Sequence, residues 1–344
     1  MRLPQDQNVN VSLLSSVFRN TVATYKYYWF LSIIECVEEG KDEIEKRELF
    51  ARMIVNAWYT VNYFRISFGK QDKIQEAVER IKALEGCALD EKKQILLNTL
   101  LTSSNKEIVK QLKHFNANVP YKFLSPWLGT HSEKEMYLMS QENYNLPPYA
   151  LYPDRILVQP AWMDYFRKNS GLIKDFCFWN LTLFLQTRNP NVPNIPSKLI
   201  RPEKRGSLVK HKKDFWDIVL EKTGPVKCIY TNKSLKIGEY AVEHFIPFQF
   251  VSHDLMWNLI PADGSFNSSK SDKLPILDDY FDDFYALQQE AVKIVQFKEP
   301  KNKFLEDYLT LFHDLNLSKD RYREQIEPLI TIAHNNGFQF MKAK

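Results

Sequence analysis

The stretch Val242-Glu243-His244-Phe245-Ile246-Pro247 decides the interpretation of this chain, because it sets an acid beside an imidazole near the end of a predicted strand. Residues 240–245 are typical of a short strand, and Pro247 is consistent with its end. Neighbouring side chains on a strand point to opposite faces, so Glu243 and His244 diverge unless the strand ends or bulges there. Imidazole, with an ordinary pKa of about 6.5, suits a general base at neutral pH.

The segments around this stretch complete a small predicted unit. Residues 226–230 and 257–261 read as two further short strands, and Asn267-Ser268-Ser269-Lys270-Ser271-Asp272 can begin a short helix. Two strands joined by a loop and followed by a helix can enclose a small pocket. The sequence therefore predicts a compact site built within about fifty residues.

Phosphodiester hydrolysis is a reaction that such a pocket could support. It needs a base that activates water and a cation that neutralises charge on the phosphate. Mg²⁺ prefers oxygen ligands and keeps several waters, and Glu243 and Asn267 supply a carboxylate and an amide oxygen. Lys270 could steady a phosphate oxygen or remain a solvated helix residue, and the sequence leaves these alternatives open.

These residues resemble the HNH (ββα-metal) endonuclease motif. The likeness is closest to the nuclease domain of RNA-guided CRISPR enzymes, whose pattern is Asp-His, then Asn, then Asn-x-x-Lys-Ser-Asp. The resemblance implies that His244 activates water and that Glu243 and Asn267 bind Mg²⁺ or Mn²⁺. It also implies that Asn258 braces the loop through backbone hydrogen bonds, within a ββα-metal fold over roughly residues 224–275.

Two departures from that family pattern affect the predicted site. The acid is glutamate where the CRISPR version has aspartate, so the carboxylate of Glu243 lies one methylene further from the backbone. Many HNH domains also carry paired cysteines that hold a structural zinc, whereas Cys228 stands alone. We therefore expect no structural zinc and expect the surrounding helices to support the site.

The rest of the chain indicates an α+β protein that is largely helical outside the small nuclease domain. Apolar residues recur at helical spacing in residues 49–61 and 74–84, and further helices are expected at 160–186, 276–297, 302–315 and 319–334. The sequence predicts four regions. They are a helical N-terminal domain at 1–118, a mixed region with a basic linker at 119–213, the HNH domain at 214–298 and C-terminal helices at 299–344.

Bulk composition restricts the class of protein. Hydrophobic residues make up 44% of the 344 residues and aromatic residues 14%, which is a globular composition. The four cysteines form no CxxC pair, and the apolar run 27–37 is too short to cross a bilayer. The polar first residues show no signal peptide. We expect a cytoplasmic protein with no membrane association.

A basic run precedes the candidate catalytic segment. It could be a solvated linker face, but its position favours contact with nucleic-acid phosphates. The residues predicted to bind nucleic acid are Lys198, Arg201, Lys204, Arg205, Lys210, Lys212 and Lys213.

The function predicted from these features is a metal-dependent DNA endonuclease, with a restriction or anti-phage role suggested by the resemblance. DNA is the expected partner, together with a defence-system subunit or a second copy of the chain, because one HNH site cuts one strand at a time. Two alternatives remain open: a nucleic-acid-binding or scaffolding subunit whose HNH fold has lost turnover, and a nuclease that acts on RNA or single-stranded DNA.

Overall fold

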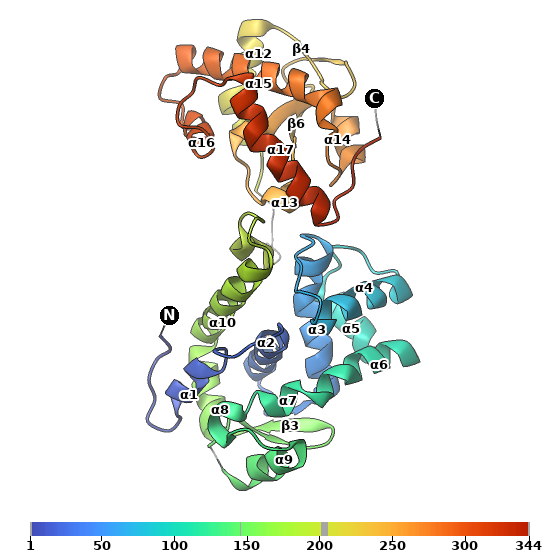
Figure 1. The fold of residues 1–344 in the computed structure, drawn as a ribbon, viewed down its shortest axis with the longest axis vertical. Helices are drawn as coiled ribbons and strands as arrows, with labels where there is room; N and C mark the ends of the chain where they lie inside the picture. Colours follow the sequence, from blue (N-terminus) through green and yellow to red (C-terminus); the bar gives the residue numbers. More distant parts are fainter. Residues whose placement is uncertain (1, 145, 201–205, 343–344) are drawn as a thin grey trace. The chain divides into compact units, whose positions relative to one another are not determined.

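The computed structural model describes residues 2–144, 146–200 and 206–342. The chain divides into two compact units (Figure 1). Unit 1 comprises Met1–Pro190 with Ile195–Arg201, and unit 2 comprises Asn191–Asn194 with Pro202–Lys344. The predicted boundary at 118/119 falls inside unit 1 and the one at 298/299 inside unit 2, because helices on both sides of each boundary share a core.

Unit 1 is mainly helical. Its α-helices are α1 (Val11–Ser16), α2 (Tyr25–Glu38), α3 (Lys46–Asn62), α4 (Lys73–Glu85), α5 (Lys93–Thr102), α6 (Lys106–His114), α7 (Val119–Lys122), α8 (Ser125–Leu128), α9 (Glu133–Glu142) and α10 (Pro160–Arg188). The long helix α10 packs along α2, and α2 packs on α3 (Figure 1). The apolar run at 27–37 lies within α2 and is almost entirely buried, so this helix forms the centre of the unit.

The helices predicted at 49–61 and 74–84 correspond to α3 and α4. Asp72 caps α4 by accepting a hydrogen bond from the Ile74 amide at 2.9 Å, and Gly86 ends it in the left-handed conformation with φ of 64°. Gly69 lies in the loop that connects α3 to α4, with φ of 94°. The helix α3 already ends at Asn62, seven residues earlier in the chain.

A small antiparallel sheet accompanies these helices, with strand order β1-β3-β2. Its strands are β1 (Glu43–Glu45), β2 (Tyr149–Leu151) and β3 (Arg155–Val158). The central strand β3 leads through Gln159 into Pro160, the first residue of α10, where proline is well tolerated. The sheet therefore fixes the start of the longest helix.

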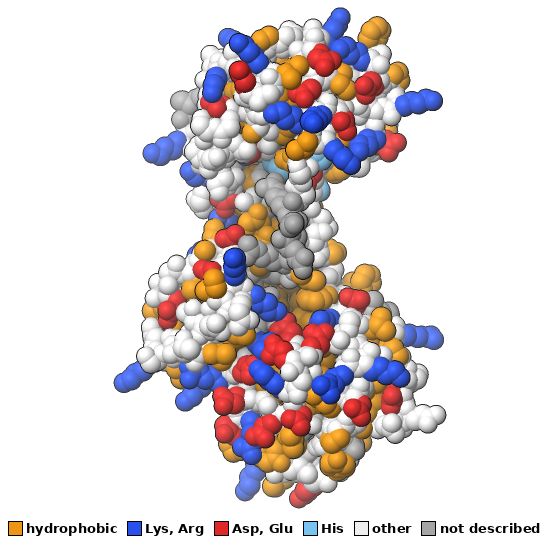
Figure 2. All heavy atoms as spheres, turned by 180° about the vertical axis from the view of Figure 1, so that it is seen from behind, with side chains coloured by type: hydrophobic (Ala, Val, Ile, Leu, Met, Phe, Trp, Pro, Cys, Tyr) orange, Lys and Arg blue, Asp and Glu red, His pale blue; other side chains and the backbone are white. Residues whose placement is uncertain are grey.

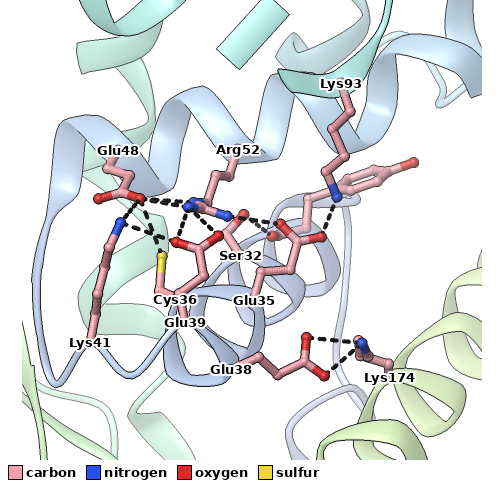
Figure 3. A network of polar contacts seen from close by, with 11 residues as sticks. Ser32, Glu35, Cys36, Glu38, Glu39, Lys41, Glu48, Arg52, Lys93 and Lys174 are labelled. Atoms are coloured by element: carbon pink, nitrogen blue, oxygen red, sulfur yellow. Dashed lines mark hydrogen bonds and ion pairs between the residues drawn. The ribbon is translucent and has the colours of Figure 1, made fainter. Parts of the chain in front are cut away.

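A buried cation ties three helices of unit 1 together (Figure 3). Arg52 is only 5% exposed, and its guanidinium contacts Glu39 at 2.6 Å, Glu48 at 2.7 Å and Glu35 at 3.6 Å. Lys93 reaches Glu35 from α5. Because a buried guanidinium is costly unless paired, this network stabilises the contacts of α2, α3 and α5 rather than forming an open site.

Unit 2 places short strands among helices. Its helical segments are α11 (Val209–His211), a π-helical turn (Lys212–Trp216), α12 (Asp217–Thr223), α13 (Phe248–Val251), the 3-10 turn η4 (Met256–Asn258), α14 (Gly264–Lys270), α15 (Leu277–Lys298), α16 (Leu305–Leu309) and α17 (Lys319–Asn335). Its strands are β4 (Val226–Lys227), β5 (Ser234–Leu235), β6 (Ala241–His244) and β7 (Leu259–Ala262). The observed architecture of the chain is α+β, as predicted.

The strands β6 and β7 form the two-stranded ribbon at the centre of unit 2. They pair antiparallel, with Glu243 opposite Ile260 and His244 opposite Leu259. The predicted strand at 257–261 thus begins two residues later, because Trp257 and Asn258 belong to the turn η4. The helix expected at 302–315 is shorter than predicted, since α16 spans only Leu305–Leu309. Among the described residues, no helix is both long enough and apolar enough to cross a membrane.

Candidate functional site

His244 is the last residue of β6, and its ring is turned into unit 2. The residue is 3% exposed, and its Nε2 atom lies 2.9 Å from Asp254 Oδ1. The Phe248 ring makes a T-shaped contact with the imidazole, with 5.6 Å between the two ring centres. An ionised carboxylate can only accept a hydrogen bond, so Asp254 favours the tautomer that carries the proton on Nε2. The pair therefore orients the imidazole.

Asn258 holds the loop that follows His244. Its Oδ1 accepts a hydrogen bond from the Ile246 amide and its Nδ2 donates to the Ile246 carbonyl, both at 2.8 Å. The backbone carbonyl of Asn258 also accepts from the Phe245 amide at 2.8 Å. A fully buried amide that satisfies both backbone groups of one residue fixes the loop where the strand ends. This is the bracing geometry that the resemblance implied.

Glu243 is engaged in a buried ion pair. Lys270, at the end of α14, donates to Glu243 Oε1 at 2.8 Å and to the backbone carbonyl of His244 at 2.7 Å. Lys270 is 1% exposed, so it is neither a solvated helix residue nor placed to contact a phosphate. Burial lowers the pKa of Lys270, and the Glu243 carboxylate opposes that shift. The ammonium thus joins α14 to the last two residues of β6.

Asn267 lies on α14 one helical turn before Lys270 and is half-buried. Among the described residues there is no group of three or more His, Cys, Asp or Glu side chains that could hold a metal ion by themselves. A hard ion that keeps most of its waters needs fewer protein ligands, and one carboxylate with one amide oxygen is a suitable donor set. The oxygen atoms of Glu243 and Asn267 are therefore of the type that such an ion prefers. One oxygen of the Glu243 carboxylate also accepts a hydrogen bond from Lys270.

Side chains from three helices of unit 2 support the turn η4 and the start of β7. Gln288 on α15 donates to the carbonyls of Met256 and Leu259 at 3.3 and 2.9 Å. Asp307 on α16 accepts from the Met256 amide at 2.9 Å, and Tyr322 on α17 donates to the Trp257 carbonyl at 2.6 Å. Helix side chains thus form hydrogen bonds with backbone groups of the turn η4 and the start of β7. These bonds hold in place the chain that contains Asn258.

Two residues near His244 were not singled out from the sequence. Asp254 contacts the imidazole from ten residues further along the chain, and His211 reaches in from α11. Burial lowers the pKa of His211, whereas its hydrogen bond to the Asp254 backbone and the charges of Asp254 and Asp307 oppose the shift. His211 Nδ1 is a buried atom with no hydrogen-bond partner among the described residues. No sequence signal marks His211, because it lies outside the motif.

The described residues of the basic run predicted to bind nucleic acid differ in their exposure. Lys198 belongs to unit 1 and is fully buried, with its Nζ 5.7 Å from the Phe64 ring centre, so the prediction for Lys198 is corrected. Lys212 donates to the Tyr240 carbonyl at 2.6 Å. Lys210 and Lys213 are exposed. Three of the predicted residues lie outside the described part of the chain: Arg201, Lys204 and Arg205.

Positive and negative side chains are interspersed on the surface. Figure 2 shows this mixture on the visible face of each unit rather than a separate basic face. Acidic residues in the first turns of α15 form ion pairs with α17: Asp278 with Arg323 at 3.0 Å and Asp282 with Lys319 at 2.7 Å. These ion pairs link the two helices α15 and α17.

Comparison with known families identifies this segment. Residues 228–276 match the family model described as HNH endonuclease, which confirms the family predicted from the motif. The more specific likeness to CRISPR enzymes remains a resemblance. No curated protein and no solved structure matches the chain. The match covers the strands β5, β6 and β7, the helix α14 and all the motif residues between them.

Proposed function

We propose that the HNH endonuclease domain of this chain is a metal-dependent DNA endonuclease that hydrolyses phosphodiester bonds with His244 as general base. The observation that supports this most directly is the placement of the histidine. It stands at the end of β6, beside Asp254 at 2.9 Å, above a loop that Asn258 clamps on both sides. A base must be held in one orientation to remove a proton efficiently, and this arrangement supplies that constraint.

Asp254 contributes to the base in two ways. When Nε2 carries the proton and donates it in a hydrogen bond to the carboxylate, the basic lone pair of the imidazole is on Nδ1. Nδ1 then accepts the proton of the attacking water. The negative charge of Asp254 then stabilises the imidazolium that forms. Asp254 is therefore a positioning residue, while His244 is the residue that takes the proton.

Glu243 and Asn267 are the proposed ligands of the divalent ion. A bound Mg²⁺ or Mn²⁺ would stabilise charge on the phosphate and on the leaving oxygen. Lys270 holds the Glu243 carboxylate in a fixed position through a 2.8 Å contact. Asn258 acts on the loop and does not need to touch the substrate. Lys270 is thus assigned a supporting role.

The proposal includes DNA as the substrate and a role in defence as the biological setting. Exposed lysines such as Lys210 and Lys213 are candidates for phosphate contacts on DNA. One HNH site cleaves one strand at a time, so a double-strand break would require a second copy of the chain or a partner subunit. Restriction or anti-phage defence is the setting that the family resemblance suggests.

A second candidate function rests on one specific observation. The ammonium of Lys270 occupies the position of a cation beside Glu243, in a buried pair at 2.8 Å. A permanent pair of this kind would compete with a divalent ion for the carboxylate. It favours the alternative in which the domain binds nucleic acid without cleaving it.

A substrate panel separates these functions. Purified protein is incubated with supercoiled plasmid, single-stranded DNA or RNA, in Mg²⁺, in Mn²⁺ or in EDTA. We expect nicking of the plasmid that depends on the metal. Cleavage confined to RNA or single strands would transfer the proposal to those substrates. Binding of DNA without cleavage in either metal would support the non-catalytic alternative.

The role of Glu243 is tested in the same assay by Glu243→Asp, which shortens the side chain by one methylene. Isothermal titration of Mn²⁺ into the wild-type protein and into Glu243→Gln provides a readout that is independent of turnover. Loss of Mn²⁺ binding in Glu243→Gln is expected, and unchanged binding would remove Glu243 from the ligand set.

A further inference from the structure

Unit 1 contains a cavity of about 720 Å³ that the proposed nuclease chemistry does not use. Its wall is formed by the loop between α1 and α2 and by residues of α2, α7 and α8, and the start of α4, the end of α6 and the loop before α9 complete it. The volume falls in the range of about 300–1,000 Å³ that is usual for small-molecule sites. Its dimensions thus suit a ligand the size of a nucleotide.

The cavity wall is positively charged. Three lysines contribute to it, Lys26, Lys73 and Lys122, and the described residues that line it include no aspartate or glutamate. Such a one-sided lining contrasts with the mixed charges on the visible surface (Figure 2). A concave wall lined by one sign of charge concentrates ligands of the opposite sign.

Two of these lysines have no carboxylate partner within the part of the chain that the structure describes. Lys73 pairs with Glu76 at 2.6 Å, but Lys26 donates to the Val17 carbonyl at 3.2 Å and Lys122 to Asn118 Oδ1 at 2.6 Å. Burial lowers the pKa of Lys26, and the positive charge of Lys122 lowers it further. The two ammonium groups therefore repel each other, and an anion placed between them would relieve that repulsion.

The rest of the lining suits the remaining parts of a nucleotide. Thr21, Ser125 and Thr130 offer hydroxyl groups, and Tyr25 and Tyr121 offer aromatic rings. The Tyr25 ring is held in place, because its hydroxyl accepts a hydrogen bond from the Lys73 amide at 2.8 Å and the ring makes a T-shaped contact with Phe115. A fixed ring is a suitable surface on which a base can stack.

We propose that this cavity binds a nucleotide, with Lys26 and Lys122 holding its phosphate and the tyrosine rings contacting its base. The ligand is either a free nucleotide or the 5′-phosphorylated end of a nucleic-acid strand, which share this chemistry. The site belongs to unit 1 and does not depend on cleavage by unit 2.

Calorimetric titration of the full chain in EDTA, where metal-dependent cleavage is suppressed, tests the assignment. The probes are ADP, adenosine, and (dT)₆ with or without a 5′-phosphate. The variants are Lys26→Gln, Lys122→Gln, the double variant, and Lys168→Gln as a control that removes an exposed lysine outside the cavity. Thermal unfolding of each variant establishes that it is folded, and Lys26→Arg retains the charge if Lys26→Gln is unstable.

We expect a phosphorylated probe to bind, with affinity reduced about tenfold by either single lysine variant and more by the double variant, because each charged hydrogen bond contributes about that factor. Lys168→Gln should bind as the wild type does. ADP binding without displacement by the phosphorylated (dT)₆ identifies a free nucleotide, whereas displacement, or binding of the phosphorylated (dT)₆ alone, identifies a strand end. The proposal is overturned if no phosphorylated probe binds, if adenosine binds as tightly as ADP, or if the control variant weakens binding as much as Lys122→Gln.

Discussion

Two carboxylates lie next to the candidate base, and each has a different partner. Asp254 contacts the His244 ring at 2.9 Å, and Glu243 contacts the Lys270 ammonium at 2.8 Å. The first contact orients a proton acceptor, and the second neutralises a buried acid. Asp254 and Glu243 therefore have different roles, although both are acidic residues close to His244.

Replacing Asp254 by Asn should lower the nicking rate roughly 10- to 100-fold, the usual effect of removing a group that orients an active-site side chain. The amide retains the shape of the side chain but can present a donor to Nε2 and favour the wrong tautomer. Initial rates of plasmid nicking provide the measurement, with Asp314→Asn as the control because Asp314 pairs with Arg321 on the surface. A rate equal to that of the wild type would exclude the positioning role.

Replacing Lys270 by Met should reduce the free energy of unfolding by about 3–5 kcal/mol, because it leaves Glu243 buried and uncompensated. The double variant Glu243→Gln with Lys270→Met should recover much of that loss, since it removes both charges. Chemical denaturation of the four proteins in this double-mutant cycle measures the coupling. Additive effects of the two substitutions would mean that the buried pair does not couple these residues energetically.

At the scale of elements, the site is a short ribbon and one helix held by a helical frame. The ribbon β6–β7 carries His244, and α14 carries Asn267 and Lys270. Side chains from α15, α16 and α17 form hydrogen bonds with backbone groups of η4, which lies between the two strands. Only α14 and the ribbon belong to the motif, so the precision of the site depends on helices outside it.

Replacing Tyr322 by Phe tests this dependence, because it removes one hydrogen bond to the Trp257 carbonyl and leaves a buried acceptor without its partner. We expect a loss of about 1–3 kcal/mol in the free energy of unfolding. Amide hydrogen exchange around residues 256–259 should also become faster. Unchanged exchange there, with normal stability, would show that α17 does not hold the loop.

The sequence predicted the parts of the site that follow from local pattern. The end of a strand near Pro247 was expected from the proline, and bracing of the loop by Asn258 was implied by the family resemblance. The partner of Lys270 was not, because the direction of a lysine side chain depends on how α14 packs on β6. Asp254 and His211 were missed for the same reason, since their contacts with the site arise only when separate segments fold together.

At the scale of the whole molecule, the chain forms two units where four regions were predicted. A boundary was predicted between residues 118 and 119, but α7 packs on α2 within unit 1. The basic run at 198–213 likewise looked continuous in sequence. Its first residue is buried in unit 1 and its last is exposed in unit 2, a division that composition cannot reveal.

The buried Lys198 makes stability depend on pH. Burial lowers its pKa from the ordinary 10.5 to about 7, so between these values the unfolded chain binds the proton and the folded chain does not. This penalty is fully present below pH 7 and disappears as the pH rises toward 10.5. Lys198→Met should therefore flatten the rise in unfolding free energy between about pH 7 and 9. Parallel pH profiles for the two proteins would contradict the assignment.

The proposed function depends above all on His244 acting as the general base of a metal-dependent nuclease. Its most direct test compares nicking of supercoiled plasmid in Mg²⁺ or Mn²⁺ by the wild-type protein, by His244→Ala and by His313→Ala, which removes an exposed histidine elsewhere in unit 2. Loss of the base should lower the rate about 10²- to 10⁴-fold, the usual contribution of general-base catalysis, while the control retains full activity. Metal-dependent nicking that persists at the wild-type rate in His244→Ala would contradict the account.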